Sequence, residues 1–217
     1  MTVIDPCLSA RNLGIVLDST LSMEKHLTSL ARNATNSLRY IGRLRKYLDE
    51  DNTKKLVNAF VISKLDYCNS LFYGLPEKST HCLQRLQNTA ARIITKTKKY
   101  DHITPVLREL HWLPVKYRSH FKVLLLTYKC IHNMAPQYLS ELLTVHNPSR
   151  TLRSSQDISL VPPKLTNIKT KFYGNRAFSL AAPQLWNSLP SEVRSSRSCD
   201  IFKRKLKTYL FKAAFNV

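Results

Sequence analysis

The chain has 217 residues, which is enough for one domain with a sizeable core or for one domain with an appendage. Its 34 lysines and arginines against 14 acidic residues give a net charge of +20, which favours a polyanionic partner. The hydrophobic content of 43% is ordinary for a globular protein, whereas the presence of only four glycines and the high share of leucine, lysine and arginine favour a mainly α fold over a turn-rich β fold.

The cysteines and the apolar runs exclude several classes of protein. The five cysteines are odd in number and contain no CxxC pair, so we expect neither a disulfide framework nor a zinc module. A reducing compartment, nucleus or cytoplasm, is the expected location. Asp5 and Pro6 interrupt the first apolar residues, which argues against a secretory signal peptide. No apolar run is long enough to predict a membrane span.

An extended segment is predicted over residues 1–21. Leu13–Leu17 has the composition of a short strand, and Asp18–Thr20 resembles the turn that ends it. Because a single strand is not stable, its partner is either the segment near Val3–Leu8 or a strand outside this chain. We favour the second alternative, because the chain begins so close to the strand.

The spacing of apolar residues predicts an amphipathic helix from Ser22, as N-cap, to about Leu48. Its apolar side recurs at steps of three and four residues: Met23, Leu27, Leu30, Ala34, Leu38, Ile41, Leu44 and Leu48. A row of cations falls on the opposite side: Arg32, Arg39, Arg43 and Lys46. Such a row suits the spaced negative charges of a nucleic-acid backbone.

The same arrangement recurs in residues 79–99, with Ser79 or Thr80 as the predicted cap. Its apolar side comprises Leu83, Leu86, Ala90, Ile93 and Ile94. Its basic side comprises Arg85, Arg92, Lys96 and Lys99. One basic helix face is usually ordinary solvated surface, and cations also suit a helix C-terminus. The recurrence on two helices favours a binding role for both rows.

Further helices complete a predicted helical domain over residues 22–143. A mostly apolar, central helix is expected from about Thr53 to Phe72, capped by the acidic residues at 49–52. Three more are expected from proline starts, over residues 104–110, 114–133 and 136–143.

The composition changes after residue 143, and we predict a basic C-terminal segment over residues 144–217. Residues 144–170 resemble a linker with a short strand at Ile158–Val161. Phe172, Phe178 and Trp186 belong to an aromatic cluster that packs as core or stacks on bases. A basic helix is predicted from about Asp200 to Phe211.

No catalytic motif was found. The sequence lacks a phosphate-binding glycine loop, a nucleophile elbow and a helix with metal-ligand spacing. Asp49 and Asp51 are a close acidic pair, but a helix cap explains them. We therefore expect no catalytic residue, no metal ligand and no cofactor, and a chain that is not an enzyme on its own.

Several strings occur in an order and spacing that resemble one family. They are NLGIVLDSTLSMEKHL, LVNAFVISKLDYCNSLFYGLP, LQRLQNTAARIIT, LRELHWLPVKYR, RAFSLAAPQLWNSLPSEVR and FKRKLKTYLF. Together they resemble the C-terminal part of reverse transcriptases from non-LTR, LINE-type retrotransposons of the jockey-like kind. The resemblance implies that residues 1–21 are the end of the palm, and that the helices of 22–143 are a thumb that clamps the primer–template duplex. It assigns no role to residues 144–217.

The sequence also departs from that family. The aromatic-Ala-Asp-Asp motif that holds two Mg²⁺ ions in the family's palm is absent, and so is the endonuclease domain. The resemblance therefore implies a fragment of an RNA-directed DNA polymerase that keeps the grip on an RNA–DNA or DNA duplex. The missing palm and fingers of the parent polymerase are a further expected partner, and a membrane is not. Two alternatives are a helical protein-interaction module and a translated fragment of a decayed element without function.

Overall fold

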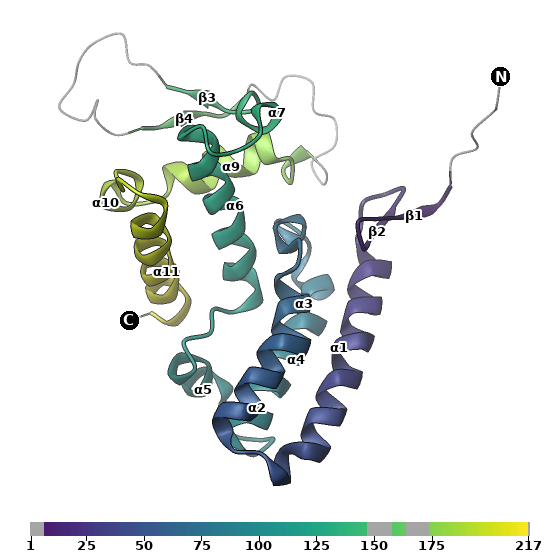
Figure 1. Cartoon of the computed structure of the whole chain (residues 1–217). Coiled ribbons are helices and arrows are strands. Elements are labelled where there is room, and N and C mark those ends of the chain that lie inside the picture. The colour runs from purple at the N-terminus through teal and green to yellow at the C-terminus, as the bar shows by residue number, and fades with distance from the viewer. Residues whose placement is uncertain (1–6, 147–157, 164–173, 217) are drawn as a thin grey trace. The chain divides into compact units, whose positions relative to one another are not determined.

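A computed structural model describes residues 7–146, 158–163 and 174–216 of the chain (Figure 1). The fold is mainly α, as the composition predicted, with a small two-stranded sheet at the N-terminal end. The chain forms two compact units, Met1–Lys116 and Tyr117–Val217, which we describe separately.

The N-terminal sheet is a β-hairpin made within the chain. Strand β1 (Ser9–Asn12) pairs antiparallel with β2 (Ile15–Asp18), in the register Ser9 to Asp18. Leu13 and Gly14 form the connection, with φ angles of 46° and 84°. Positive φ at both central residues is the geometry of the tight turns that suit a hairpin, and glycine adopts it without strain. The favoured expectation of a strand partner outside the chain was therefore wrong, because Leu13 and Gly14 are the turn and not the start of the strand.

Helix α1 (Glu24–Leu44) begins later than predicted and has a different cap. Its N-cap position is Met23, with a φ of 62°, and not Ser22. The Asp18 carboxylate accepts hydrogen bonds from the backbone N–H of Ser22 at 2.9 Å and of Met23 at 2.8 Å. Burial would raise the pKa of Asp18, but hydrogen bonds from Thr20, Ser22 and Met23 outweigh burial and hold that pKa below its ordinary value. One carboxylate thus joins the hairpin to the start of α1.

The chain returns along α1 through a series of short helices. A 3₁₀ turn, η1 (Arg45–Tyr47), leads to α2 (Glu50–Val57), the π-helical segment η2 (Asn58–Ile62) and α3 (Ser63–Asp66). The Asp49 carboxylate accepts a hydrogen bond from the Asn52 backbone N–H at 2.7 Å, which confirms the predicted cap. The predicted helix to Phe72 ends early, because Cys68 has a left-handed φ of 51° that an α-helix excludes. A 3₁₀ segment, η3 (Asn69–Phe72), follows.

Helix α4 (Glu77–Thr95) completes the helical layer of the first unit, beside α1 and α2. It begins directly after Pro76, so the predicted caps Ser79 and Thr80 lie inside its first turn. Helix α5 (Ile103–Glu109) packs on α4. The Gln87 amide, fully buried, donates to the Leu113 carbonyl at 2.9 Å, which ties the segment after α5 to α4.

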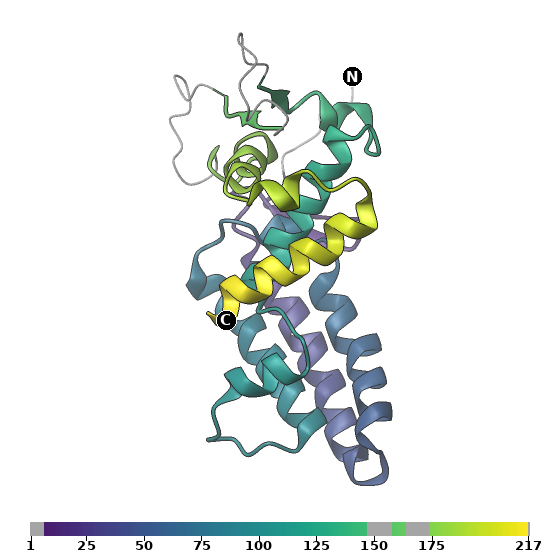
Figure 2. The same cartoon turned by 90° about the vertical axis from the view of Figure 1, so that its left-hand side faces the viewer.

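The second unit is built on helix α6 (Val115–Ile131), which starts at Pro114 as predicted (Figure 2). After it come α7 (Gln137–Ser140), the antiparallel strands β3 (Thr144–Val145) and β4 (Leu160–Val161), α9 (Phe178–Asn187), α10 (Ser191–Arg194) and α11 (Cys199–Phe215). The predicted strand at 158–161 is thus present in its last two residues.

Aromatic side chains form the core of the second unit. Tyr128 of α6 stacks on Phe202 of α11, with ring centroids 4.3 Å apart, and Trp186 of α9 lies 5.8 Å from Phe202. The Trp186 indole N–H donates to the Ile158 carbonyl at 2.8 Å. Trp186 is fully buried, which confirms the core interpretation of this part of the aromatic cluster. Phe172 lies outside the described residues.

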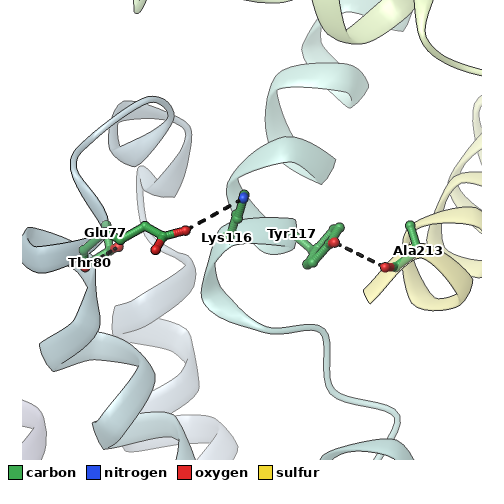
Figure 3. A network of polar contacts seen from close by, with 5 residues as sticks. All are labelled: Glu77, Thr80, Lys116, Tyr117 and Ala213. Atoms are coloured by element: carbon green, nitrogen blue, oxygen red, sulfur yellow. Dashed lines mark hydrogen bonds and ion pairs between the residues drawn. The ribbon is translucent and has the colours of Figure 1, made fainter. Parts of the chain in front are cut away.

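The compact units differ from the predicted domain organisation, in which one boundary lay between residues 143 and 144. Helix α6 was assigned to the helical domain, but its Tyr128 stacks on the C-terminal segment. The contacts at the start of α6 show where the two compact units divide (Figure 3). Lys116 makes an exposed ion pair with Glu77 of the first unit, at 3.9 Å, whereas the next residue, Tyr117, donates its hydroxyl proton to the Ala213 carbonyl of the second unit, at 3.1 Å.

We predict that Asp18→Ala destabilises the first unit by about 1 kcal/mol, because the substitution removes the acceptor for the backbone N–H groups of Ser22 and Met23 in the turn before α1. Urea unfolding followed by far-UV circular dichroism measures this loss.

The same carboxylate predicts a dependence on pH. Because its folded pKa is below the unfolded value of about 3.9, its contribution is present above that pH and is lost as the pH falls further. Asp18→Ala should therefore flatten the acid limb of the stability profile, and an unchanged limb would contradict this role.

Candidate nucleic-acid interface

The first predicted row of cations lies on the solvent side of α1. Arg32, Arg39 and Arg43 are exposed, and Lys46 is exposed on the following 3₁₀ turn. The buried side of α1 comprises His26, Leu27, Ala34, Leu38 and Ile41. The predicted separation of apolar and basic residues is therefore confirmed as far as Ile41, whereas Leu44, predicted on the apolar side, is 49% exposed. We call the four cations the α1 row.

The second row is less regular. Arg85 is exposed on α4, and Lys96 follows the helix in a left-handed C-cap with a φ of 57°. Lys99 is exposed in the next turn and lies over the Tyr100 ring, 5.6 Å from its centroid. We call Arg85, Arg92, Lys96 and Lys99 the α4 row. Only its first two members lie within the helix, so helical spacing does not fix the direction of the lysines.

Arg92 has a structural role that the sequence did not indicate. Its guanidinium is half-buried and donates to the carbonyls of Lys98, at 3.3 Å, and Asp101, at 3.1 Å. Asp101 in turn accepts from the Lys98 backbone N–H at 3.1 Å. Arg92 thus holds the turn after α4, and part of its hydrogen-bonding capacity is already used.

Helices α1 and α4 run in the same direction. Arg45, just after the C-terminal end of α1, donates from Nε to the Ile93 carbonyl and from a terminal nitrogen to the Ile94 carbonyl, both at 2.9 Å. These carbonyls belong to the C-terminal end of α4. A Cβ atom at Gly42 would lie 3.9 Å from the Ile93 side chain, so these two residues mark the line of contact between the helices.

This contact places the helical members of the two rows, Arg32, Arg39 and Arg43 of α1 and Arg85 and Arg92 of α4, on the same side of the helix pair. At about 100° per residue, Arg32, Arg39 and Arg43 lie about 60–100° around α1 from Gly42. Arg85 and Arg92 lie about 80–100° around α4 from Ile93, in the opposite rotational sense. For two parallel helices, opposite senses of rotation lead to the same side. Helix α3 lies on the other side of the pair, where Lys64 donates to the Ser37 hydroxyl at 3.2 Å.

Short side chains occupy the strip between the two rows. Helical spacing places Thr28, Thr35 and Gly42 of α1 and Cys82 and Thr89 of α4 there, and all five are exposed. Because none of them is long, an extended ligand can lie close to both helix backbones while long basic side chains reach it from each side. We call this strip, with the two rows, the cationic face.

The charges of the cationic face are not neutralised by acidic side chains in the part of the chain that the structure describes. Among the described residues, no member of either row makes an ion pair with an acidic side chain. The sequence explains this, because Glu24 is the one acid within α1 and Glu77 the one acid within α4, each in the first turn. An uncompensated row of cations gives a strong local positive potential.

Exposed tyrosines accompany the cations, and the sequence analysis did not identify them. Tyr40 is 65% exposed with the Arg43 guanidinium 6.0 Å from its ring centroid, and Tyr47 is 75% exposed with the Lys46 ammonium at 4.7 Å. Leu44, between them, is 49% exposed. The three recur at steps of four and three residues, which is the signal that could have found them.

The described part of the chain contains no candidate metal centre. Within residues 7–146, 158–163 and 174–216, no group of three or more His, Cys, Asp or Glu side chains is arranged to hold a metal ion. In the same residues, no helix is both long and apolar enough to cross a bilayer.

Comparisons with known proteins add no relative. No protein-family model matches the chain, and searches of curated proteins and of solved structures found no match. The geometry of the cationic face is therefore the main guide to function.

We predict that Arg45→Met destabilises the first unit by about 2 kcal/mol, because it removes charged hydrogen bonds to the last carbonyls of α4. Arg43→Met is the matched control, since Arg43 is exposed and should cost less than about 0.5 kcal/mol. Urea unfolding compares the two variants, and equal losses would contradict the assigned role of Arg45.

Proposed function

We propose that this chain binds the sugar-phosphate backbone of an RNA–DNA or DNA duplex through the cationic face, without reading the base sequence. The observation that supports the proposal best is the placement of two cation rows on one side of two parallel, directly packed helices. Arginine and lysine contacts to phosphates supply affinity and position, while specificity requires contacts to base edges. The helical cations of the arrangement follow one another at intervals of one or two helical turns, which suits contacts to successive phosphates.

The spacing within the α1 row suits a polyphosphate ligand. Arg39 and Arg43 are separated by about 6 Å along the helix axis, and Arg32 and Arg39 by about 10.5 Å. The phosphates of one strand repeat about every 3.4 Å along a duplex axis, so each interval spans about two or three phosphates. Long side chains adjust the remaining mismatch, which is the expected behaviour of a contact that does not depend on sequence.

The resemblance to LINE-type reverse transcriptases supports a duplex as the form of the ligand. We propose on that resemblance that the chain derives from the thumb region of such a polymerase, whose Mg²⁺-dependent chemistry belongs to other parts of the family's proteins. The five cysteines are free thiols, which supports a reducing compartment, nucleus or cytoplasm, as the place of action.

A second candidate function is docking to another protein, and one observation favours it. Tyr40, Leu44 and Tyr47 form an exposed strip along α1, next to the α1 row. Exposed tyrosines beside arginine are common in protein interfaces. Pull-down with and without nuclease treatment separates the two functions, because partners held through nucleic acid are lost after digestion.

We predict that the triple variant Arg32→Glu, Arg39→Glu and Arg85→Glu loses at least about 100-fold in affinity for a duplex at moderate salt. The slope of log K against log salt concentration should decrease in magnitude by about 3, one unit for each lost phosphate contact. Fluorescence anisotropy with a labelled duplex, over a salt series, measures both quantities.

The matched control reverses three cations elsewhere in the first unit, with Lys54→Glu, Lys55→Glu and Arg108→Glu. The total charge change is identical, but these residues lie on α2 and α5 and outside the cationic face. We expect a much smaller loss of affinity and little change in slope. Equal losses in the two triple variants would show that net charge alone attracts the duplex and would overturn the assignment of the site.

A further inference from the structure

A cleft of about 450 Å³ lies in the first unit, between the N-terminal hairpin and the helices α1 and α3. It is separate from the cationic face, because α3 packs on the other side of the α1–α4 pair. Its walls are Arg11 and Val16 of the hairpin, His26, Ser29 and Asn33 of α1, and Lys64 and Tyr67 of α3. Neither the proposed duplex contact nor the hydrophobic core accounts for this collection of polar groups.

The cleft presents hydrogen-bond donors and positive charge, and no carboxylate lines it. Arg11 and Lys64 supply two cations from different elements. Within the described residues, Arg11 has no hydrogen-bond or ion-pair partner, and neither do the side chains of Ser29 and Asn33, one turn apart on α1. Lys64 donates to the Ser37 hydroxyl at 3.2 Å and retains two further protons.

His26 adds a buried donor that the fold leaves unsatisfied. Its side chain is 7% exposed, and its Nδ1 accepts from the Val16 backbone N–H at 3.4 Å. In the neutral ring the proton is therefore on Nε2, and Nε2 is buried without a hydrogen-bond partner. His26 therefore contributes its ring to the wall of the cleft, while its Nε2 is closed off from solvent.

The walls are held in place before any ligand binds. The Tyr67 hydroxyl donates to the Leu13 carbonyl in the hairpin turn, at 2.6 Å, and joins the hairpin to the end of α3. The hydrogen bond from Val16 to His26 joins the hairpin to α1. Because the three elements are tied together in this way, the backbone segments that carry the donors are held in place before binding.

We propose that this cleft binds a phosphate monoester, with Arg11 and Lys64 supplying the charge and Ser29 and Asn33 supplying neutral donors. A phosphate group offers several acceptor oxygens and a net negative charge, which matches a donor set that contains two cations and no acid. The volume admits a nucleotide as well as a single phosphate group. The ligand is therefore either a free nucleotide or the terminal phosphate of a nucleic-acid strand.

Calorimetric titration of the full chain with AMP and with adenosine tests the proposal. We expect AMP to bind and adenosine to bind at least about tenfold more weakly, because the phosphate carries the interaction. Equal binding of the two, or no binding of AMP, would overturn the proposal. A pair of short oligonucleotides, with and without a 5′-phosphate, then identifies the source: tighter binding of the phosphorylated strand points to a strand terminus, and equal binding to a free nucleotide.

The double variant Arg11→Gln and Lys64→Gln should lose at least about tenfold in affinity for AMP. Lys25→Gln is the control, since Lys25 is an exposed cation beside the hairpin that does not line the cleft. Should the double variant unfold, Arg11→Gln alone serves, because Arg11 is exposed and unpartnered. AMP affinity that survives in a folded Arg11→Gln variant would overturn the assignment.

Two readouts separate this site from the cationic face. The triple reversal on α1 and α4 should leave AMP binding unchanged, and Arg11→Gln should leave the salt dependence of duplex binding unchanged.

Bound phosphate should also raise the pKa of His26, which burial lowers in the free protein. Titration of the His26 ring signals by NMR, with and without AMP, measures this shift, and no shift would contradict a phosphate beside the ring.

Discussion

The parallel contact between α1 and α4 is the constraint on which the rest of the first unit depends. Arg45 crosses from the end of α1 to the last carbonyls of α4, and Gly42 faces the Ile93 side chain. Helix C-termini leave carbonyls without partners, so a guanidinium that satisfies two of them fixes both the direction and the register of the pair. An antiparallel arrangement of the same helices would separate the two cation rows onto opposite sides.

The same contact gives neighbouring cations different structural roles. Arg43 and Arg45 are two residues apart, yet one is exposed beside Tyr40 and the other is bound to backbone carbonyls. Arg92 holds a turn, whereas Arg85, two helical turns earlier, is exposed. A basic residue on an amphipathic helix is thus available to a ligand only when the helix directs it away from every carbonyl that needs a donor. The unpaired charges that remain are costly for the chain alone, through mutual repulsion, and are relieved by a polyanion.

Although the N-terminal hairpin is small, it forms one wall of the cleft. A two-stranded sheet is marginal by itself, and this one is held by Asp18 at the start of α1, by His26 within α1 and by Tyr67 at the end of α3. These contacts place Arg11 opposite Lys64, although 53 positions of sequence separate them. The second unit shows the same principle in its core, where Tyr128, Trp186 and Phe202 come from three helices.

The helical class, the positions of most helices and the exposed, basic side of α1 could be predicted from the sequence, because they follow from periodicity and from local caps such as Asp49. The sequence also predicted that the C-terminal aromatics include core residues such as Trp186. The pairing of the hairpin, the early end of α3 at Asp66, the division of the chain at Lys116 and the different contacts of Arg43 and Arg45 could be seen only in the folded chain. Each of these depends on a left-handed backbone angle or on a partner far away in sequence, and helical periodicity contains neither kind of information.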